Sequence, residues 1–264
     1  MPIHPSLQLK SVSDKDFVVI DKAVMDCAYA AHNKFGRLFD ERIYENDVAA
    51  RLRALGLEVH TQVPVLVEHG TFQKTYYLDL VVNHMLYELK VVSILTSDHD
   101  AQALHYAILQ DIRLVKLLNF GEVKVRGRLL QNALESKERR HPTHRKTGMT
   151  ILTPSCERLV SHFRALLHDW GTHLSASLYS EALVHYFGGE PHCVQRIELK
   201  DDQLTLGTHR VQFHSEDHAF IVTSLHRDQQ AYRRHLDVLL SHTGLKAIQW
   251  LNLNQDRVEV TTIQ

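Results

Sequence analysis

The chain has 264 residues, 44% of them apolar and 23% charged, and its formal net charge is −1 with histidine counted as neutral. These values are ordinary for a folded globular protein, so they exclude global disorder, and the near-zero charge excludes the strongly basic surface of a dedicated nucleic-acid binder. The three cysteines, Cys27, Cys156 and Cys193, are far apart and odd in number, which predicts reduced thiols that pack in the interior. The sequence shows neither a secretory leader nor an apolar run of about 18 residues, so we expect a cytoplasmic protein with no membrane contact.

Hydrophobic spacing in the first half of the chain predicts the element order ααβββαβ. Apolar residues recur at helical spacing in three segments, and runs rich in β-branched and aromatic residues occupy four others. The predicted helices span 18–34, 40–56 and 98–112, and the predicted strands span 57–70, 75–82, 85–92 and 113–120. Alternation of this kind predicts an α/β domain.

A polar and basic segment follows this first set of elements. Residues 123–148 contain eight Lys or Arg and two Glu, a net charge of +6. Such a run is typical of a solvated linker, and it is equally compatible with a strip that binds phosphate. Pro142, Gly148 and Pro154 indicate a domain boundary in this region. We therefore predict a first domain over 1–136, a basic and polar linker over 137–155, and a second domain over 156–264.

The second half of the chain resembles a diverged copy of the first. Gly36 and Tyr44 recur as Gly171 and Tyr179, and two strand patterns recur at offsets that drift from 135 to 133 residues. Chance similarity between two α/β segments is the alternative explanation. This alignment replaces the charged residues of interest as follows: Glu41 by Ala176, Asp79 by Phe213, Glu88 by Val222 and Lys90 by Ser224. The second half is therefore predicted to be a degenerate, inactive repeat.

The segment YYLDLVVNHMLYELKVV predicts a hairpin that turns at Asn83 and His84. Counting outward from this turn places Asp79 opposite Glu88, and Lys90 shares a face with Glu88. Like charges opposed across two strands destabilise a sheet, and an exposed salt-bridged pair is the simple alternative for Glu88 and Lys90. Carboxylates on adjacent strands suit Mg²⁺ or Mn²⁺, and Lys90 would then orient or help to deprotonate water at the metal.

With these residues in place, the chain resembles a known family, the GxxExxY proteins of the PD-(D/E)XK nuclease superfamily. The resemblance covers about residues 15–134 and rests on three segments and their order: ERIYENDVAARLRALGLEVHTQVPV, LDLVVNHMLYELKVV and HDAQALHYAILQDIRLVKLLNF. Two positions depart from the family pattern, Leu38 in place of the motif's glycine and Leu78 in place of a proline before Asp79. The resemblance implies a restriction-endonuclease-like core, with a central mixed sheet flanked by helices, and divalent-metal-dependent cleavage of phosphodiester bonds.

The resemblance also implies roles for individual residues. The implied catalytic residues are Asp79, Glu88, Lys90 and Glu41. The implied metal ligands are Glu41, Asp79, Glu88 and the backbone carbonyl of Leu89. The implied substrate-positioning residues are Gln102, Tyr106, Tyr44 and His99.

Several of these residues also have plain structural explanations. Glu41 fits an exposed acid in the first turn of a helix, where a negative charge is favoured. Gln102 and Tyr106 lie one helical turn apart, so they also fit a polar helix face. His99 fits a residue that simply begins a helix.

The sequence therefore predicts an α/β protein with a restriction-endonuclease-like core, duplicated in tandem as an internal pseudo-dimer, with further homodimerisation left open. Its predicted function is Mg²⁺- or Mn²⁺-dependent hydrolysis of nucleic acid, with DNA favoured over RNA and a single active site in the N-terminal half. The alternative is a non-catalytic protein on a nuclease fold that binds nucleic acid or acts as a protein scaffold.

Overall fold

The computed structural model describes residues 2–133, 143–146, 148–202, 204–255 and 257–264. It divides into two compact units, of which the first comprises residues 1–68 and 73–136 and the second comprises residues 69–72 and 137–264. Among the helices that the structure describes, none combines the length and the apolar character needed to span a bilayer.

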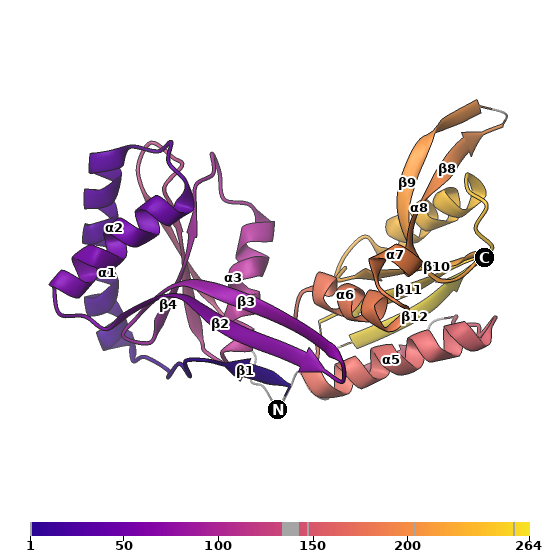
Figure 1. Ribbon diagram of the computed structural model, residues 1–264, viewed down its shortest axis with the longest axis horizontal. Helices are drawn as coiled ribbons and strands as arrows, with labels where there is room; N and C mark the ends of the chain where they lie inside the picture. The colour runs from indigo at the N-terminus through magenta and orange to yellow at the C-terminus, as the bar shows by residue number, and fades with distance from the viewer. Residues whose placement is uncertain (1, 134–142, 147, 203, 256) are drawn as a thin grey trace. The chain divides into compact units, whose positions relative to one another are not determined.

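The first unit is a six-stranded mixed sheet with helices on both faces (Figure 1). Its elements are β1 (Ile3–Pro5), α1 (Asp14–Phe35), α2 (Glu41–Ala54), β2 (Val59–His69), β3 (Phe72–Val82), β4 (Met85–Lys90), α3 (Ser97–Leu109), β5 (Leu114–Asn119) and β6 (Arg126–Gln131). The strands lie in the order β1-β2-β3-β4-β5-β6. The predicted order ααβββαβ is confirmed, whereas the edge strands β1 and β6 were not predicted because they are short and largely polar.

Helices α1 and α2 cover one face of the sheet, and α3 covers the other (Figure 1). The main core of the unit lies under α1 and α2, where Val24, Val48 and Leu52 pack against Leu80 and Tyr87 of the sheet. Side chains that alternate with Leu80 and Tyr87 along β3 and β4 therefore point toward α3.

The hairpin between β3 and β4 turns at Asn83 and His84, as predicted. Both residues have positive φ, 44° and 70°, which is the conformation of a type I′ turn. Val82 pairs with Met85, and the strand pairing continues outward as far as the pair Leu80 and Tyr87. The register predicted from the sequence is therefore confirmed up to Leu80, the residue that follows Asp79 in the chain.

The connection between α1 and α2 is held by a buried tyrosine. Gly36 ends α1 with φ 71°, and its carbonyl accepts a hydrogen bond of 2.7 Å from the Tyr44 hydroxyl. The Tyr44 ring stacks on Phe120 at 4.6 Å between centroids. These contacts hold the connection between the two helices, and Glu41 lies in the first turn of α2.

The second unit is also a six-stranded mixed sheet flanked by helices. Its elements are β7 (Thr143–Lys146), α5 (Pro154–Trp170), α6 (Ala176–Tyr186), α7 (Glu190–Cys193), β8 (Val194–Asp201), β9 (Leu204–Ser215), β10 (His218–Thr223), α8 (Gln229–Ser241), β11 (Ala247–Asn254) and β12 (Arg257–Ile263). The strands lie in the order β7-β12-β11-β10-β9-β8. In each unit the strand after the hairpin pairs in parallel with the strand after the helix, β4 with β5 and β10 with β11.

The predicted linker is only partly described. Residues 134–142 and 147 lie outside the described residues, whereas Thr143–Lys146 forms β7, which pairs in parallel with β12. No local sequence pattern predicts β7, because its pairing partner β12 lies more than 100 residues away in the sequence. Of the basic side chains before the gap, Arg126 lies 3.4 Å from Glu122 and Arg128 lies 2.8 Å from Asp100.

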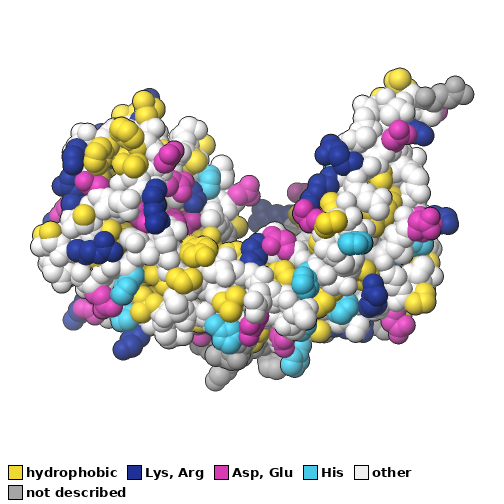
Figure 2. Space-filling view, viewed as in Figure 1, with side chains coloured by type: hydrophobic (Ala, Val, Ile, Leu, Met, Phe, Trp, Pro, Cys, Tyr) yellow, Lys and Arg dark blue, Asp and Glu magenta, His cyan; other side chains and the backbone are white. Residues whose placement is uncertain are grey.

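The three cysteines are buried and form no disulfide, which confirms the prediction of reduced packing residues. On the face drawn in Figure 2, Lys and Arg side chains are interspersed with Asp and Glu rather than gathered into one extended patch. This distribution fits the net charge of −1. Any basic contact surface on this face is therefore local.

Candidate functional site

The structure brings most of the predicted site residues together on the α3 face of the first sheet. Glu88 and Lys90 alternate with Leu89 along β4, so their side chains share that face. Asp79 lies on the neighbouring strand β3, and Glu41 approaches from the first turn of α2.

The side chain of Asp79 accepts a backbone hydrogen bond at the end of the paired part of the β3–β4 hairpin. Its Oδ2 accepts a hydrogen bond of 2.9 Å from the backbone N–H of Leu89. Its Oδ1 accepts a second bond, of 3.3 Å, from the side-chain amide of Gln62 on β2. Both oxygens are thus held by neutral donors, which fixes the direction of the carboxylate but leaves its charge uncompensated.

Glu88 and Lys90 form a buried ion pair. Lys90 Nζ lies 2.7 Å from Glu88 Oε1, and only 1% of Glu88 and 8% of Lys90 are exposed. Glu88 Oε2 is buried and has no hydrogen-bond partner among the described residues. A buried carboxylate oxygen without a partner is unfavourable, so the pair is incompletely satisfied.

The pKa shifts indicate an excess of negative charge at this place. Burial raises the pKa of Glu88 to about 8, and the charge of Asp79 adds to that rise while Lys90 opposes it. Burial lowers the pKa of Lys90, but attraction to Glu88, Glu41 and Asp79 outweighs this effect and raises the pKa overall. An acid and a base whose pKa values are both raised lie in a negative potential.

Glu41 lies at the solvent side of the group. Its side chain is 44% exposed, and its Oε2 is 3.9 Å from Lys90 Nζ. Its Oε1 accepts a hydrogen bond of 3.3 Å from the backbone N–H of Val91, directly after β4. The structure therefore joins this first-turn acid to the end of β4 and places it beside Lys90.

Gln102 and Tyr106 share one face of α3, as predicted. Gln102 Nε2 donates to the Tyr106 hydroxyl at 3.1 Å. Burial raises the pKa of Tyr106, and the charges of Glu88 and Asp79 add to the shift. Tyr106 thus lies within the electrostatic reach of the carboxylates.

Two of the predicted substrate-positioning residues have structural contacts instead. Tyr44 is fully buried between Gly36 and Phe120, so it cannot contact a substrate, and that part of the prediction is corrected. His99 Nδ1 accepts a hydrogen bond of 2.9 Å from the backbone N–H of Thr96, the residue that precedes α3. His99 therefore contributes to the start of that helix, which was the structural explanation available from the sequence.

The site contains two further residues, Glu45 and Gln62, which the sequence did not indicate. Glu45 is 3% exposed on α2, and Gln62 of β2 donates to its Oε2 at 2.6 Å. Gln62 has φ 52°, a left-handed conformation that costs a non-glycine residue on the order of 1–3 kcal/mol. Glu45 could have been found from its spacing, because it lies one turn after Glu41, but no local pattern marks Gln62.

The donor set can be compared with what a divalent cation requires. Counted as ionised, Asp79, Glu88, Glu41 and Lys90 carry a net charge of −2, the amount that one divalent cation neutralises. Hard oxygen ligands and an unpartnered Glu88 Oε2 suit Mg²⁺ or Mn²⁺. Among the described residues, no group of three His, Cys, Asp or Glu side chains forms a ready-made metal cage. Protein donors already occupy Glu88 Oε1 and both Asp79 oxygens, so this site would recruit a cation through one or two carboxylates.

Comparison with known families agrees with this geometry. Residues 19–129 match the PD-(D/E)XK nuclease superfamily. The match contains every candidate site residue, from Glu41 to Tyr106, and ends before residues 137–264 of the second unit. Nucleases of this superfamily generally use divalent metal ions, and the two mixed sheets flanked by helices are consistent with its fold. No curated protein and no solved structure matches the chain.

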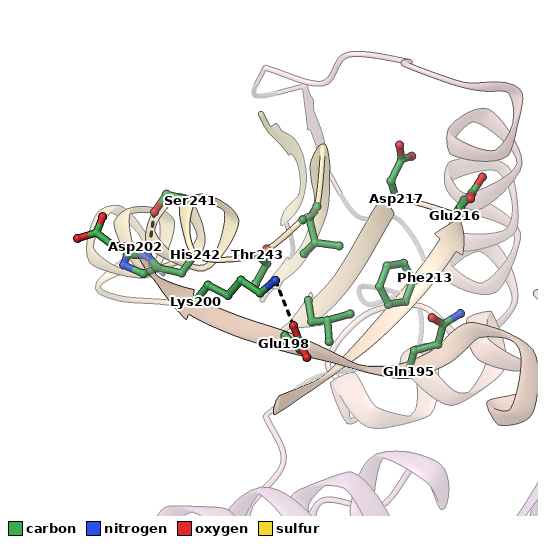
Figure 3. A pocket seen from close by; sticks show the side chains of 13 residues that line it. Gln195, Glu198, Lys200, Asp202, Phe213, Glu216, Asp217, Ser241, His242 and Thr243 are labelled. Atoms are coloured by element: carbon green, nitrogen blue, oxygen red, sulfur yellow. Dashed lines mark hydrogen bonds and ion pairs between the residues drawn. The ribbon is translucent and has the colours of Figure 1, made fainter. Parts of the chain in front are cut away.

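The second unit contains a hollow that lacks this chemistry. Figure 3 shows it beside β8, the turn after β9 and the end of α8. Lys200 points to Glu198, with 3.2 Å between Nζ and Oε2, and Asp217 is paired with Lys246 and His218. Because Glu198 and Asp217 are already paired with basic side chains, these two carboxylates are poor candidates for cation ligands.

Proposed function

We propose that the first unit is a divalent-metal-dependent nuclease that hydrolyses phosphodiester bonds of nucleic acid, with Asp79, Glu88, Lys90 and Glu41 at its centre. The observation that carries this proposal is the buried excess of negative charge around Glu88. A protein tolerates buried negative charge only where something offsets it; Lys90 offsets one carboxylate here, and a bound cation would offset the others. The superfamily match supports the same chemistry.

In this proposal Asp79 and Glu88 hold the cation, with Glu41 and the Leu89 carbonyl as further oxygen donors. A bound divalent ion supplies Lewis acidity and offsets charge that develops on the phosphate. Lys90 holds its proton on Nζ beside the carboxylates, where it orients the attacking water. Tyr106, whose hydroxyl oxygen accepts a hydrogen bond from Gln102, donates a hydrogen bond to a phosphate oxygen.

We further propose that the second unit is a degenerate repeat of the first. Tyr179 donates to the Gly171 carbonyl at 2.6 Å, as Tyr44 does to Gly36, and both residues of the pair are displaced by 135 positions. Both units also share the sequence of antiparallel and parallel strand pairs described above. Two independent features therefore support duplication over chance similarity.

An asparagine contact gives the same result. Asn119 Oδ1 accepts from the Val92 N–H at 3.1 Å, and its Nδ2 donates to the Val92 carbonyl at 2.9 Å. Asn252 makes the same two contacts with Leu225, at 2.8 and 3.0 Å, and both residues are displaced by 133 positions.

The strand register changes the alignment expected from the sequence. Lys90 pairs with Asn119 and Thr223 pairs with Asn252, so Thr223 rather than Ser224 corresponds to Lys90. By the same count Ile221, not Val222, corresponds to Glu88. The sequence alignment was wrong here because it applies to β10 the same residue offset between the two halves that holds at the β9–β10 turn.

The position of Asp79 is also reassigned. The register between β9 and β10 shifts between His218 and Ala219, so that Ala219 pairs with Phe213. Counting on from this pair places Val211 opposite Ile221, and Val211 rather than Phe213 then corresponds to Asp79. Val211 and Ile221 pack with Trp250 in the core of the second unit. In this register apolar side chains fill the place of the carboxylates, which supports a single active site in the first unit.

The proposal is tested by incubating the full chain with single- and double-stranded DNA and RNA in Mn²⁺, Mg²⁺ or EDTA. We expect metal-dependent cleavage, with DNA the preferred polymer, and a loss of at least about a hundredfold in Lys90→Ala. Lys22→Ala, which changes an exposed lysine paired with Asp26, is the matched control and should cleave normally. Cleavage that persists in Lys90→Ala would indicate a contaminating enzyme, and binding without cleavage would favour the non-catalytic scaffold.

A further inference from the structure

Gln62 occupies an unusual place in the first unit. It lies within β2, a strand of 11 residues, yet its φ of 52° is left-handed. A residue other than glycine adopts this conformation inside a strand only where its surroundings hold it there, typically at a bulge that redirects a side chain. The contacts of that side chain therefore indicate what this backbone conformation achieves.

The Gln62 amide bridges two carboxylates. Its Nε2 donates to Glu45 Oε2 at 2.6 Å and to Asp79 Oδ1 at 3.3 Å. A primary amide has two N–H donors, and ionised carboxylates only accept, so both protons of the amide are engaged. Gln62 thus connects α2 to β3 through donors that no other residue type of similar size provides in this orientation.

Glu45 anchors the other end of the bridge. Arg42 Nη1 lies 2.9 Å from Glu45 Oε1, so each oxygen of this buried carboxylate has its own donor. Burial raises the pKa of Glu45, while Gln62 and Arg42 oppose the shift by favouring the ionised form. The charge of Glu45 is compensated locally, which sets it apart from the charge of Glu88.

We propose that Gln62, anchored by Glu45, is a positioning residue that fixes the Asp79 carboxylate in the direction required to bind the cation. With Gln62 on Oδ1 and the Leu89 N–H on Oδ2, the carboxylate has no free rotation. The inference rests on the proposed nuclease function and extends it to two residues that the sequence did not indicate. The competing explanation is a purely structural bridge between α2 and the sheet.

Gln62→Gly separates the two explanations in the full-length protein. Glycine adopts positive φ without strain, so the metal-free melting temperature should hold or rise even though the bridge is lost. Asp111→Gly, at another left-handed position of the same unit (φ 55°), is the matched control for this backbone effect. The readout is the apparent affinity for Mn²⁺, obtained from the metal dependence of the melting temperature followed by circular dichroism.

We expect Gln62→Gly to weaken Mn²⁺ binding about tenfold and Asp111→Gly to leave it unchanged. Gln62→Asn introduces a residue that tolerates left-handed backbone and retains the amide group, but its side chain is shorter by one methylene. It should therefore weaken Mn²⁺ binding to a similar extent. Should Gln62→Gly fail to fold, Gln62→Asn decides the question alone.

The outcomes distinguish this inference from the function on which it rests. If the parent responds to Mn²⁺ and both Gln62 variants respond equally, the positioning role is overturned while the nuclease site stands. A structural bridge alone would instead lower the metal-free melting temperature in both variants without changing the Mn²⁺ affinity, which also overturns it. If the parent itself shows no response, the metal site and this inference fall together.

Discussion

Asp79 Oδ2 accepts the backbone N–H of Leu89 at 2.9 Å, just beyond the last paired residues of the β3–β4 ladder. A side chain has thus replaced a backbone acceptor at the end of the hairpin. The replacement directs a carboxylate toward Glu88 and Lys90, and it explains why an acid is found in the apolar C-terminal part of β3.

Asp79→Asn is predicted to abolish stabilisation of the first unit by Mn²⁺. At a metal concentration 100 times Kd, binding adds about 2.7 kcal/mol to the free energy of unfolding, and the amide removes a charged ligand. Both tryptophans, Trp170 and Trp250, lie in the second unit. The metal-dependent shift should therefore appear in circular dichroism of the whole chain and be absent from tryptophan fluorescence. Equal shifts in the parent and the variant would remove the site hypothesis.

Glu88→Gln should raise the metal-free stability of the first unit while abolishing cleavage. The amide keeps the shape of the side chain but removes one buried charge from a place with excess negative potential, a gain of about 1–2 kcal/mol. Urea unfolding in EDTA, followed by circular dichroism, measures the stability, and the cleavage assay measures the loss. A variant less stable than the parent would mean that Lys90 already compensates Glu88 fully.

Tyr44→Phe and Tyr179→Phe form a matched pair across the two units. Each change removes one hydroxyl bond to a glycine carbonyl and should destabilise its own unit by about 1 kcal/mol. Tyr179→Phe should shift the tryptophan-reported transition, and Tyr44→Phe should leave that transition and the rate of cleavage unchanged. A large loss of cleavage in Tyr44→Phe, with stability preserved, would restore a role for Tyr44 at the substrate.

The second unit should lose stability in mild acid because of His214. This residue is buried, neither ring nitrogen has a hydrogen-bond partner among the described residues, and burial lowers its pKa to about 4, with His218 and Arg158 adding to the shift. The folded pKa lies below the unfolded value of about 6.5, so the unfolded state binds the extra proton, and stability falls as pH decreases from about 6.5 toward 4.

Replacing His214 by leucine should remove part of this dependence, on the order of 2 kcal/mol between pH 6.5 and pH 4. His235→Leu, at an exposed position of α8, is the control and should keep the dependence of the parent. Urea unfolding followed by tryptophan fluorescence at several pH values provides the test. The same slope in the parent and in His214→Leu would assign the acid sensitivity to other groups.

Local patterns were sufficient for the hairpin. Asn83 and His84 separate two β-runs, and the period of two along a strand then places Glu88 and Lys90 on one face. The sequence could not show the left-handed backbone at Gln62, because the side-chain contacts that accompany it are with Glu45 and Asp79, which are distant in the chain. Burial is equally non-local, which is why Tyr44 was assigned to the substrate and Glu45 was overlooked.

The second half of the chain also shows that local sequence similarity does not determine which side chains face each other in the fold. A similarity of spacing aligned Gly171 with Gly36 and Tyr179 with Tyr44, and in each unit the tyrosine donates to its own glycine carbonyl. Across β9 and β10 the proposed alignment differs from the sequence alignment by one or two residues, since the register shift beside His218 changes which side chains face each other. Sequence similarity aligns residues by their order in the chain, whereas the pairing of the strands decides which side chains lie opposite each other in the sheet.

The tyrosine–glycine and asparagine contacts occur in both units and lie outside the candidate site. The residues that hold these connections are thus separate from the residues of the candidate site. If the second unit is a degenerate repeat, as proposed, it retains the framework of an active domain and is a starting point for engineering. Acidic residues at Val211 and Ile221 and a lysine at Thr223, with a smaller side chain at Trp250, would rebuild a polar centre on a scaffold that already exists.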